Sequence, residues 1–160
     1  MKLRPIREAD VPAVLELNQL SVDATSPLDA DRLRQLIDWS THAHVLDGDV
    51  GVVAFFLVFG HDSAYDGTNF AWFVDRYPDG FLYLDRIIVA ESHRRRGIGG
   101  LIYSAVETQA TPGRLTCEVV CEPPNTASLA FHQGRGFVQV GTLAQPNGKV
   151  CSMLVKELPG

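Results

Sequence analysis

The alternation of apolar and polar positions along the chain predicts an α/β order of elements. Apolar residues at helical spacing predict a first helix after Asp10, which is expected to cap it, and a second helix over residues 29–39. Two apolar runs, 45–46 and 51–59, flank a polar turn at residues 47–49 and predict a β-hairpin. The first third of the chain is therefore expected to contain two helices and two neighbouring strands.

The rest of the chain continues this alternation after a less regular stretch. Residues 60–80 are rich in Gly, Asp and aromatic side chains without a clean period, so we expect a loop there, and long loops in small domains are usually functional. The later expected elements are a strand over 81–89, a helix from Ile98 to a stop at Pro112-Gly113, a strand over 115–120, a helix over 125–134 and a terminal hairpin of 137–143 with 150–158.

Composition narrows the class of protein. A chain of 160 residues with 46% apolar content is expected to form one domain over residues 1–160. No run of about 20 apolar residues occurs and the N-terminus lacks the apolar region of a signal peptide, so we expect a cytoplasmic protein without membrane contact. Three cysteines without a Cys-x-x-Cys pair indicate neither a disulfide framework nor a metal site, and the net charge of −5 disfavours nucleic acid.

The segment 94–100, Arg-Arg-Arg-Gly-Ile-Gly-Gly, carries the strongest chemical signal. It lies between an expected strand and an expected helix, where unpaired backbone N–H groups and the helix dipole favour an anion. The three arginines would add charged contacts to phosphate oxygens. Leu101-Ile102 stand where a P-loop needs Lys followed by Ser or Thr, and Ile102 replaces the third glycine of a dinucleotide fingerprint. The segment therefore predicts a pyrophosphate site of another kind.

Arg94, Gly97 and Gly99 match the Gln/Arg-x-x-Gly-x-Gly/Ala signature of the GNAT acetyltransferases. The segment 125–137 resembles the C-terminal motif of that family, and the opening 3–12 resembles its first strand and the turn into its first helix. The resemblance implies an α/β (α+β layered) fold, with a mixed, mainly antiparallel central sheet flanked by helices and splayed at the strand that binds acetyl-CoA. Acetyl-CoA would be the co-substrate, without a metal.

The resemblance also implies acetyl transfer to a primary amine of a small molecule or peptide, by direct attack and without an acyl-enzyme. A different hypothesis is a sensor or subunit that binds CoA without turning it over. A third, a basic turn that binds nucleic acid or phosphoprotein, is disfavoured by the acidic balance. Homodimers are common in the family, although no sequence feature here defines an interface.

Backbone N–H at Ile88 or Val89 is expected to bind the oxyanion, while Ile87 and Val89 pair with the pantetheine amides in the manner of an added strand. Asn125 is expected to cap its helix and to bind the pantetheine arm. The full set expected to contact CoA is Ile87, Ile88, Val89, Arg94, Arg95, Arg96, Gly97, Ile98, Gly99, Gly100, Asn125, Ser128, Phe131 and His132.

Three side chains are candidates for proton transfer. Asp85, among apolar neighbours on its strand, is the first candidate for the general base, and the alternative is a structural ion pair with Arg86. Glu118 on the next strand is the second candidate. His132 stands where the family commonly has Tyr, as general acid or base, or else as a helix-surface or CoA-stacking residue. A water chain without a single base is the remaining alternative.

Aromatic and acidic residues between 65 and 83 would suit an organic ammonium through cation–π and ionic contacts. The expected substrate-binding residues are Tyr65, Phe70, Trp72 and Tyr83. The alternative is a hydrophobic plug over the edge of the sheet. The sequence does not choose among amino acid, polyamine, aminoglycoside-like and protein N-terminal amines, and O-acetylation also stays open.

Overall fold

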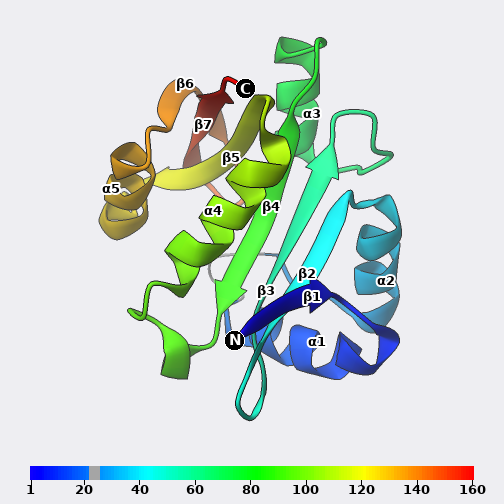
Figure 1. Cartoon of the computed structure of the whole chain (residues 1–160). Helices are drawn as coiled ribbons and strands as arrows, with labels where there is room; N and C mark the ends of the chain where they lie inside the picture. The colour runs from blue at the N-terminus through cyan, green and yellow to red at the C-terminus, as the bar shows by residue number, and fades with distance from the viewer. Residues whose placement is uncertain (22–25) are drawn as a thin grey trace. The chain divides into compact units, whose positions relative to one another are not determined.

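The computed structural model describes residues 1–21 and 26–160. Seven strands and five α-helices lie in these ranges (Figure 1): β1 (Lys2–Pro5), α1 (Val11–Leu20), α2 (Ala30–Trp39), β2 (His42–Gly48), β3 (Gly51–Gly60), α3 (Thr68–Arg76), β4 (Leu82–Val89), α4 (Ile98–Ala110), β5 (Gly113–Glu122), α5 (Thr126–Gly134), β6 (Val138–Ala144) and β7 (Val150–Leu158). Short 3-10 turns, η1 (Glu8–Asp10) and η2 (Glu91–His93), precede α1 and follow β4.

The strands are hydrogen-bonded in the order β1-β2-β3-β4-β5-β7-β6. β4 and β5 are parallel, with Leu82 opposite Leu115 and Tyr83 opposite Thr116. The pairs β1–β2, β2–β3, β5–β7 and β6–β7 are antiparallel. The fold is thus the mixed, mainly antiparallel sheet with flanking helices that the sequence predicts. In the described ranges, no helix combines the length and the apolar content that crossing a membrane requires.

The chain divides into two compact units, each built from two separate stretches. The first unit comprises Met1–Tyr65 with Leu84–Val106. The second unit comprises Asp66–Tyr83 with Glu107–Gly160. β4 and α4 each contribute residues to both units, and the remaining boundary, between Tyr65 and Asp66, lies in the loop before α3.

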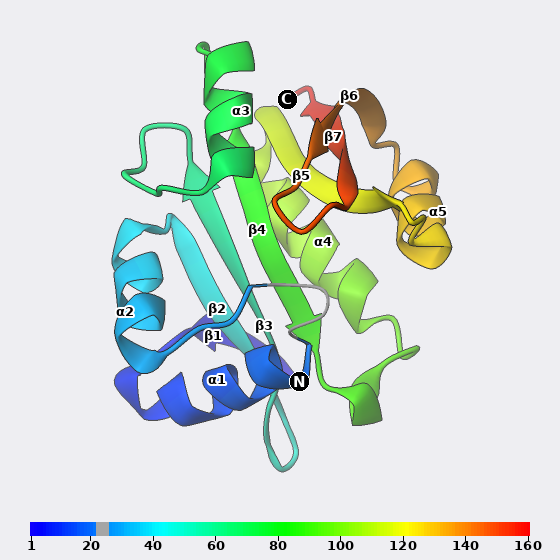
Figure 2. The same ribbon diagram turned by 180° about the vertical axis from the view of Figure 1, so that it is seen from behind.

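In the first unit, helices cover both faces of the strands. α1 and α2 lie side by side on one face, and the first part of α4 lies on the other (Figures 1 and 2). Residues 53–59 of β3 are all buried, as expected for a strand that is covered on both faces and therefore apolar at every position. Leu33 and Leu36 of α2 are buried as well. The apolar run of β3 is the centre of this unit's core.

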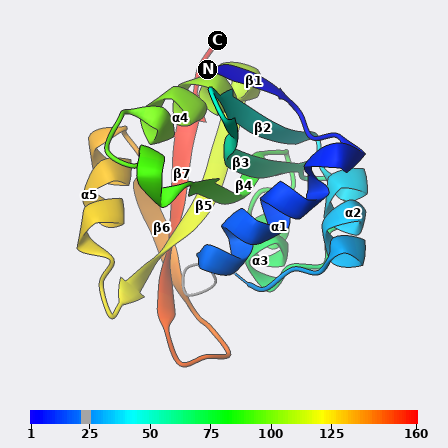
Figure 3. The same cartoon turned by 90° about the horizontal axis from the view of Figure 1, so that it is seen from below.

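In the second unit, β5, β7 and β6 form an antiparallel ribbon, and the turn between β6 and β7 lies at its far end (Figure 3). Its aromatic core brings together Phe70 and Phe73 of α3 with Phe81 and Tyr83. The ring centroids are 5.6 to 6.1 Å apart in tilted pairs, within the range that favours edge contacts. α3 is therefore held to β4 by aromatic packing.

Two expectations about local structure need correction. Asp10 stands at the N-cap position of α1, as predicted, but its side chain makes no capping hydrogen bond; its carboxylate accepts instead from the backbone N–H of Arg7 (2.7 Å) and from the Arg4 guanidinium (2.7 and 2.8 Å). The Arg4 hydrogen bonds lower the pKa of Asp10 to about 2. Residues 60–80 are not one loop, since Thr68–Arg76 form α3. Phe70 and Phe73 have helical spacing and pack inward, but the surrounding Gly and Asp residues hide this short period.

The other predicted elements are confirmed with bounds that differ by at most three residues. Asp29 is the N-cap of α2, and its side chain accepts a hydrogen bond from the Arg32 backbone N–H at 2.7 Å. α4 ends at Ala110, immediately before the expected stop at Pro112 and Gly113.

Candidate active site

The glycine loop lies in the first unit, between the end of β4 and the start of α4. Arg95 and Gly97 have positive φ values of 64° and 75°, so two left-handed positions turn the chain into the helix. The bond from the Leu101 N–H to the Gly97 carbonyl (3.0 Å) closes the first turn. The N–H groups of residues 98–100 lie before this bond and have no carbonyl one turn earlier in the helix.

The glycine loop has open space beside these N–H donors, where a ligand can bind. A Cβ placed on Gly97 or Gly99 would meet no atom within 4 Å, so a ligand can approach the backbone closely. Ile98 is buried and anchors the start of α4, whereas Arg94, Arg95 and Arg96 are exposed. The Arg94 guanidinium donates from Nε to the Val89 carbonyl at 3.2 Å. The loop therefore fits the pyrophosphate of a CoA ester, with N–H groups, a helix N-terminus and three cations.

Asp85, on β4 in the first unit, is held by two donors. Its Oδ2 accepts from Arg86 Nε at 2.7 Å, and its Oδ1 accepts from the Tyr65 hydroxyl at 2.7 Å. The side chains of Arg86 and Asp85 are only 4% and 7% exposed. Asp85 is thus one half of a buried ion pair, which is the predicted alternative to a role as general base.

The other donors of Arg86 connect β4 to α1 and to the segment before α2. Nη1 donates to Asn18 Oδ1 at 3.0 Å and to the Ser26 carbonyl at 3.2 Å, and Nη2 donates to Ser26 Oγ at 3.0 Å. A buried guanidinium is stable only when its charge is paired and its donors are used. Arg86 meets both conditions, so this network has a structural role.

Glu118, on β5 in the second unit, lies in a different environment. The Tyr83 hydroxyl is 2.8 Å from both carboxylate oxygens, and Asn69 Nδ2 donates to Oε1 at 2.9 Å. Asn69 Oδ1 in turn accepts from Gln145 Nε2 at 3.0 Å. Glu118 is half-buried, and its carboxylate accepts hydrogen bonds from a hydroxyl and from an amide group that come from two other elements of the second unit.

At the start of α5, in the second unit, Asn125 is the N-cap, as predicted. Its Oδ1 accepts from the Ser128 backbone N–H at 3.3 Å, which leaves the amide NH₂ group as the donor for a ligand. Phe131, later in the helix, is one of the more exposed large apolar side chains. The N-terminal turn of α5 therefore offers a polar donor, and Phe131 offers an apolar surface.

His132 is not a helix-surface residue, because only 5% of it is exposed and its ring packs edge-on against Phe131 and Phe137. Its Nδ1 lies 2.7 Å from the Ser128 carbonyl, which can only accept, so Nδ1 carries the proton. Burial lowers the pKa of His132, and the charge of Arg135 lowers it further against the opposing effect of the carbonyl. The neutral ring then presents Nε2 as an acceptor, which disfavours the role of general acid.

Of the four expected substrate-binding aromatics, two are buried and two are half-buried. Phe70 and Tyr83 are 3% and 1% exposed and belong to the aromatic core of the second unit, so neither offers a ring face to a ligand. Trp72 packs over Gly141, where a Cβ would lie 2.8 Å from its ring. Tyr65, in the first unit, stacks on Phe59 at 4.2 Å between centroids. The alternative of a hydrophobic plug describes these residues better.

The structure groups the predicted residues by unit. The first unit holds Asp85, the β4 positions Ile87, Ile88 and Val89, and the glycine loop. The second unit holds Glu118 with Tyr83, and Asn125 with Ser128, Phe131 and His132. Asn69 and Gln145 were missed by sequence reasoning, and no local spacing could have found them.

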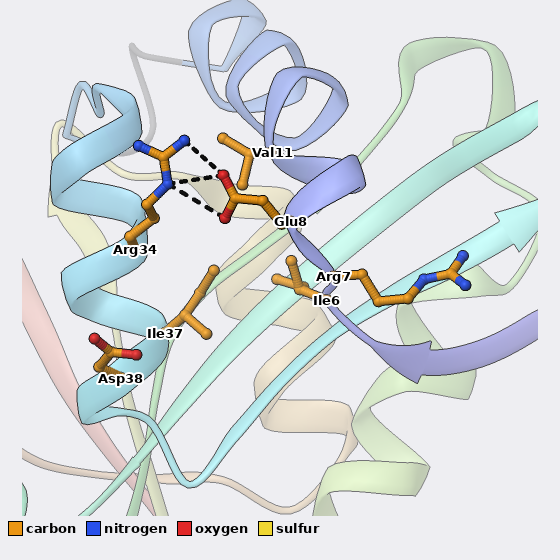
Figure 4. Close-up of a pocket in the computed structure, with 7 residues that line it drawn as sticks. All are labelled: Ile6, Arg7, Glu8, Val11, Arg34, Ile37 and Asp38. Atoms are coloured by element: carbon orange, nitrogen blue, oxygen red, sulfur yellow. Dashed lines mark hydrogen bonds and ion pairs between the residues drawn. The ribbon is translucent and has the colours of Figure 1, made fainter.

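A small pocket of about 110 Å³ lies in the first unit between η1 and α2 (Figure 4). Arg34 and Glu8 face each other across it with an Nη2–Oε1 distance of 2.6 Å, and this hydrogen bond lowers the pKa of Glu8. Its lining consists of Ile6, Arg7, Glu8, Val11, Arg34, Ile37 and Asp38. None of the predicted site residues is among them, so this pocket is separate from the CoA loop.

In the first unit, a strand leads through a glycine-rich, arginine-flanked loop into a helix, an arrangement that suits the pyrophosphate of an acyl-CoA. Residues 14–137 match the model of the acetyltransferase (GNAT) family, and the chain belongs to that family. The protein is therefore an acetyltransferase with acetyl-CoA as its co-substrate.

Solved structures share the whole fold. Ard1 from Thermoplasma volcanium has a TM-score of 0.75 at 18% identity, over 98% of this chain and 97% of that one. The ribosomal-protein-S18-alanine N-acetyltransferase from Escherichia coli has 0.71 at 15% identity, over 99% and 94%. The putative acetyltransferase yncA from Salmonella typhimurium, solved with acetyl-CoA, has 0.73 at 18% identity, over 99% and 94%. No curated protein matches the sequence.

Proposed function

We propose that the protein is an N-acetyltransferase that acetylates a primary amine of a small molecule or peptide by direct attack. The amine nitrogen forms a bond to the thioester carbonyl carbon, the C–S bond breaks, and the amine proton leaves. The products are the acetamide and free CoA thiol. The observation that carries this proposal is the Glu118 carboxylate, which the Tyr83 hydroxyl and the Asn69 amide hold in place in a member of an acetyltransferase family.

In this proposal the first unit binds the acyl donor. The N–H groups at the start of α4 and the side chains of Arg94, Arg95 and Arg96 hold the pyrophosphate, as supported by the open space at Gly97 and Gly99. Backbone groups of Ile87 and Val89 pair with the pantetheine amides, and an N–H of Ile88 or Val89 donates to the oxyanion. These backbone roles come from the resemblance of the chain to the family.

The reaction needs a proton acceptor because an alkyl ammonium with a pKa near 10 leaves roughly one molecule in a thousand unprotonated at pH 7. We assign this role to Glu118 rather than Asp85. Asp85 is already the ion-pair partner of the buried Arg86 guanidinium at 2.7 Å, so its carboxylate has a structural role. Glu118 lies on β5 and accepts hydrogen bonds from the Tyr83 phenol and the Asn69 amide, which hold its carboxylate in a defined position.

We assign no side chain as a general acid that protonates the departing CoA thiolate. His132 has its Nδ1–H bonded to the Ser128 carbonyl and a lowered pKa, so it is neutral at pH 7 and has no proton to donate from Nε2. An alkyl thiol with a pKa of roughly 8.5 is a good enough leaving group to depart before it is protonated. His132 then supports the position of α5 instead of transferring a proton.

The test is the release of free thiol from acetyl-CoA against a panel of primary amines. Amine-dependent release by the wild type is expected, and Gly99→Glu should abolish it because the new carboxylate fills the pyrophosphate loop without a steric clash. Glu118→Gln should lower kcat/KM by about 10²- to 10⁴-fold, whereas Asp85→Asn should retain most activity in folded protein. The absence of release with every amine, while acetyl-CoA still raises the melting temperature, would refute the proposal.

A further inference from the structure

We propose that Asn69 and Gln145 are positioning residues that orient the Glu118 carboxylate and link it to the turn between β6 and β7. This inference rests on the proposed role of Glu118 as general base and extends it to two residues outside the family motifs. The three side chains come from α3, β5 and the β6–β7 turn, and all lie in the second unit.

The orientation of the Asn69 amide follows from its two partners. The Gln145 amide nitrogen can only donate, so the Asn69 atom 3.0 Å away is the carbonyl oxygen Oδ1. The Asn69 NH₂ group must then face Glu118 Oε1, at 2.9 Å, where a carboxylate can only accept. The hydrogen bond from Gln145 thus orients the Asn69 amide so that its NH₂ group, and not its oxygen, faces the Glu118 carboxylate.

Gln145 is itself fixed within the turn. Its backbone N–H donates to the Lys149 carbonyl at 2.8 Å, and its carbonyl accepts from the Gly148 N–H at 3.0 Å. Its side-chain nitrogen also donates to the Leu143 carbonyl at 3.1 Å. Because both backbone and side chain are held, Gln145 transmits the geometry of the β6–β7 turn to Asn69.

The buried hydroxyl of Tyr83 approaches the same carboxylate from the start of β4. The Tyr83 hydroxyl lies 2.8 Å from both carboxylate oxygens, whereas Asn69 donates to Oε1 alone, so the Asn69 contact distinguishes the two oxygens and favours one orientation of the carboxylate. A misplacement of the reacting group by about 1 Å can lower the rate on the order of 10²-fold. Asn69 is therefore expected to contribute to kcat, through the position of Glu118, more than to acetyl-CoA binding.

The test compares steady-state kinetics of Asn69→Ala, Asn69→Asp, Gln145→Ala and the exposed control Gln109→Ala, all checked for folding by circular dichroism. We expect Asn69→Ala to lower kcat about 10- to 100-fold with the KM for acetyl-CoA unchanged. Asn69→Asp, which places a like charge against Glu118, should lose at least as much. Gln145→Ala should lose about three- to tenfold, and Gln109→Ala should match the wild type.

A double-mutant cycle separates this inference from the function on which it rests. In the Glu118→Gln background, Gln145→Ala should cause no further loss, because the base that it positions has been removed. Equal losses from Gln145→Ala in both backgrounds, or wild-type kcat in folded Asn69→Ala, would overturn the positioning role. If the wild type itself acetylates no amine, the proposed function fails instead.

Discussion

The buried pair of Arg86 and Asp85 gives the sharpest prediction about stability. Arg86→Met removes a guanidinium that donates to Asp85, Asn18 and Ser26, and leaves the Asp85 carboxylate buried with only the Tyr65 hydroxyl of its two donors. Breaking such a pair costs about 3–5 kcal/mol, because the remaining charge has lost its partner and cannot regain water. For a chain of this length, each kcal/mol corresponds to about 2–4 °C, so the melting temperature should fall by roughly 6–20 °C.

The assay is thermal unfolding followed by circular dichroism, with urea titration as an independent measure of the free energy. Asp85→Leu combined with Arg86→Met should be markedly more stable than the sum of the two single losses, since no charge is then left unpaired. A loss below about 1 kcal/mol in Arg86→Met would refute the reasoning, as would additivity in the double variant. Either result would mean that water reaches the pair and replaces the lost donors.

Three further predictions concern pH, the loop and the cysteines. Burial lowers the folded-state pKa of His42, His44 and His132, so below a pH of about 6.5 the unfolded chain binds more protons than the folded chain. The free energy of unfolding should therefore decline as the pH falls below this value. In urea titrations at several pH values, His132→Phe should make this decline shallower. Gly97→Ala, at a φ of 75°, should cost about 1–2 kcal/mol and weaken acetyl-CoA binding in calorimetry, and an unchanged Kd would contradict the loop assignment. Burial raises the pKa of the Cys151 thiol to about 11, so it is protonated at pH 7, and Cys151→Ala should retain activity; complete loss in folded protein would argue for an acyl-enzyme.

The features that the sequence predicts well depend on residues close together in the chain. The glycine loop follows from the spacing of Gly97 and Gly99 behind an apolar strand, and the caps of α2 and α5 follow from Asp29 and Asn125. Asp10 shows the limit of such local signals, because Arg4 and the Arg7 backbone bind its carboxylate and remove it from the helix that it precedes.

The site around Glu118 could not be predicted, because its partners are distant in sequence. Asn69 is 49 residues from Glu118, and Gln145 is 76 residues from Asn69. Asn69 reaches Glu118 only once α3 has formed, and Gln145 reaches Asn69 only once the β6–β7 turn has formed. The partner of Asp85, in contrast, is its sequence neighbour Arg86, so the sequence could suggest the ion pair. Only the burial of both side chains in the structure favours the ion pair over a role of Asp85 as general base.

The interleaving of the two units has a consequence for synthesis on the ribosome. The first unit is complete once Val106 has emerged, but the segment Asp66–Tyr83 of the second unit has by then emerged too, without β5, β6 or β7. At about 5–20 residues per second, the remaining chain follows over several seconds. During that interval Tyr83 lacks its β5 neighbour Thr116, and Phe70 and Phe73 belong to a unit that is still incomplete, so this aromatic segment is where a nascent chain would need protection from aggregation.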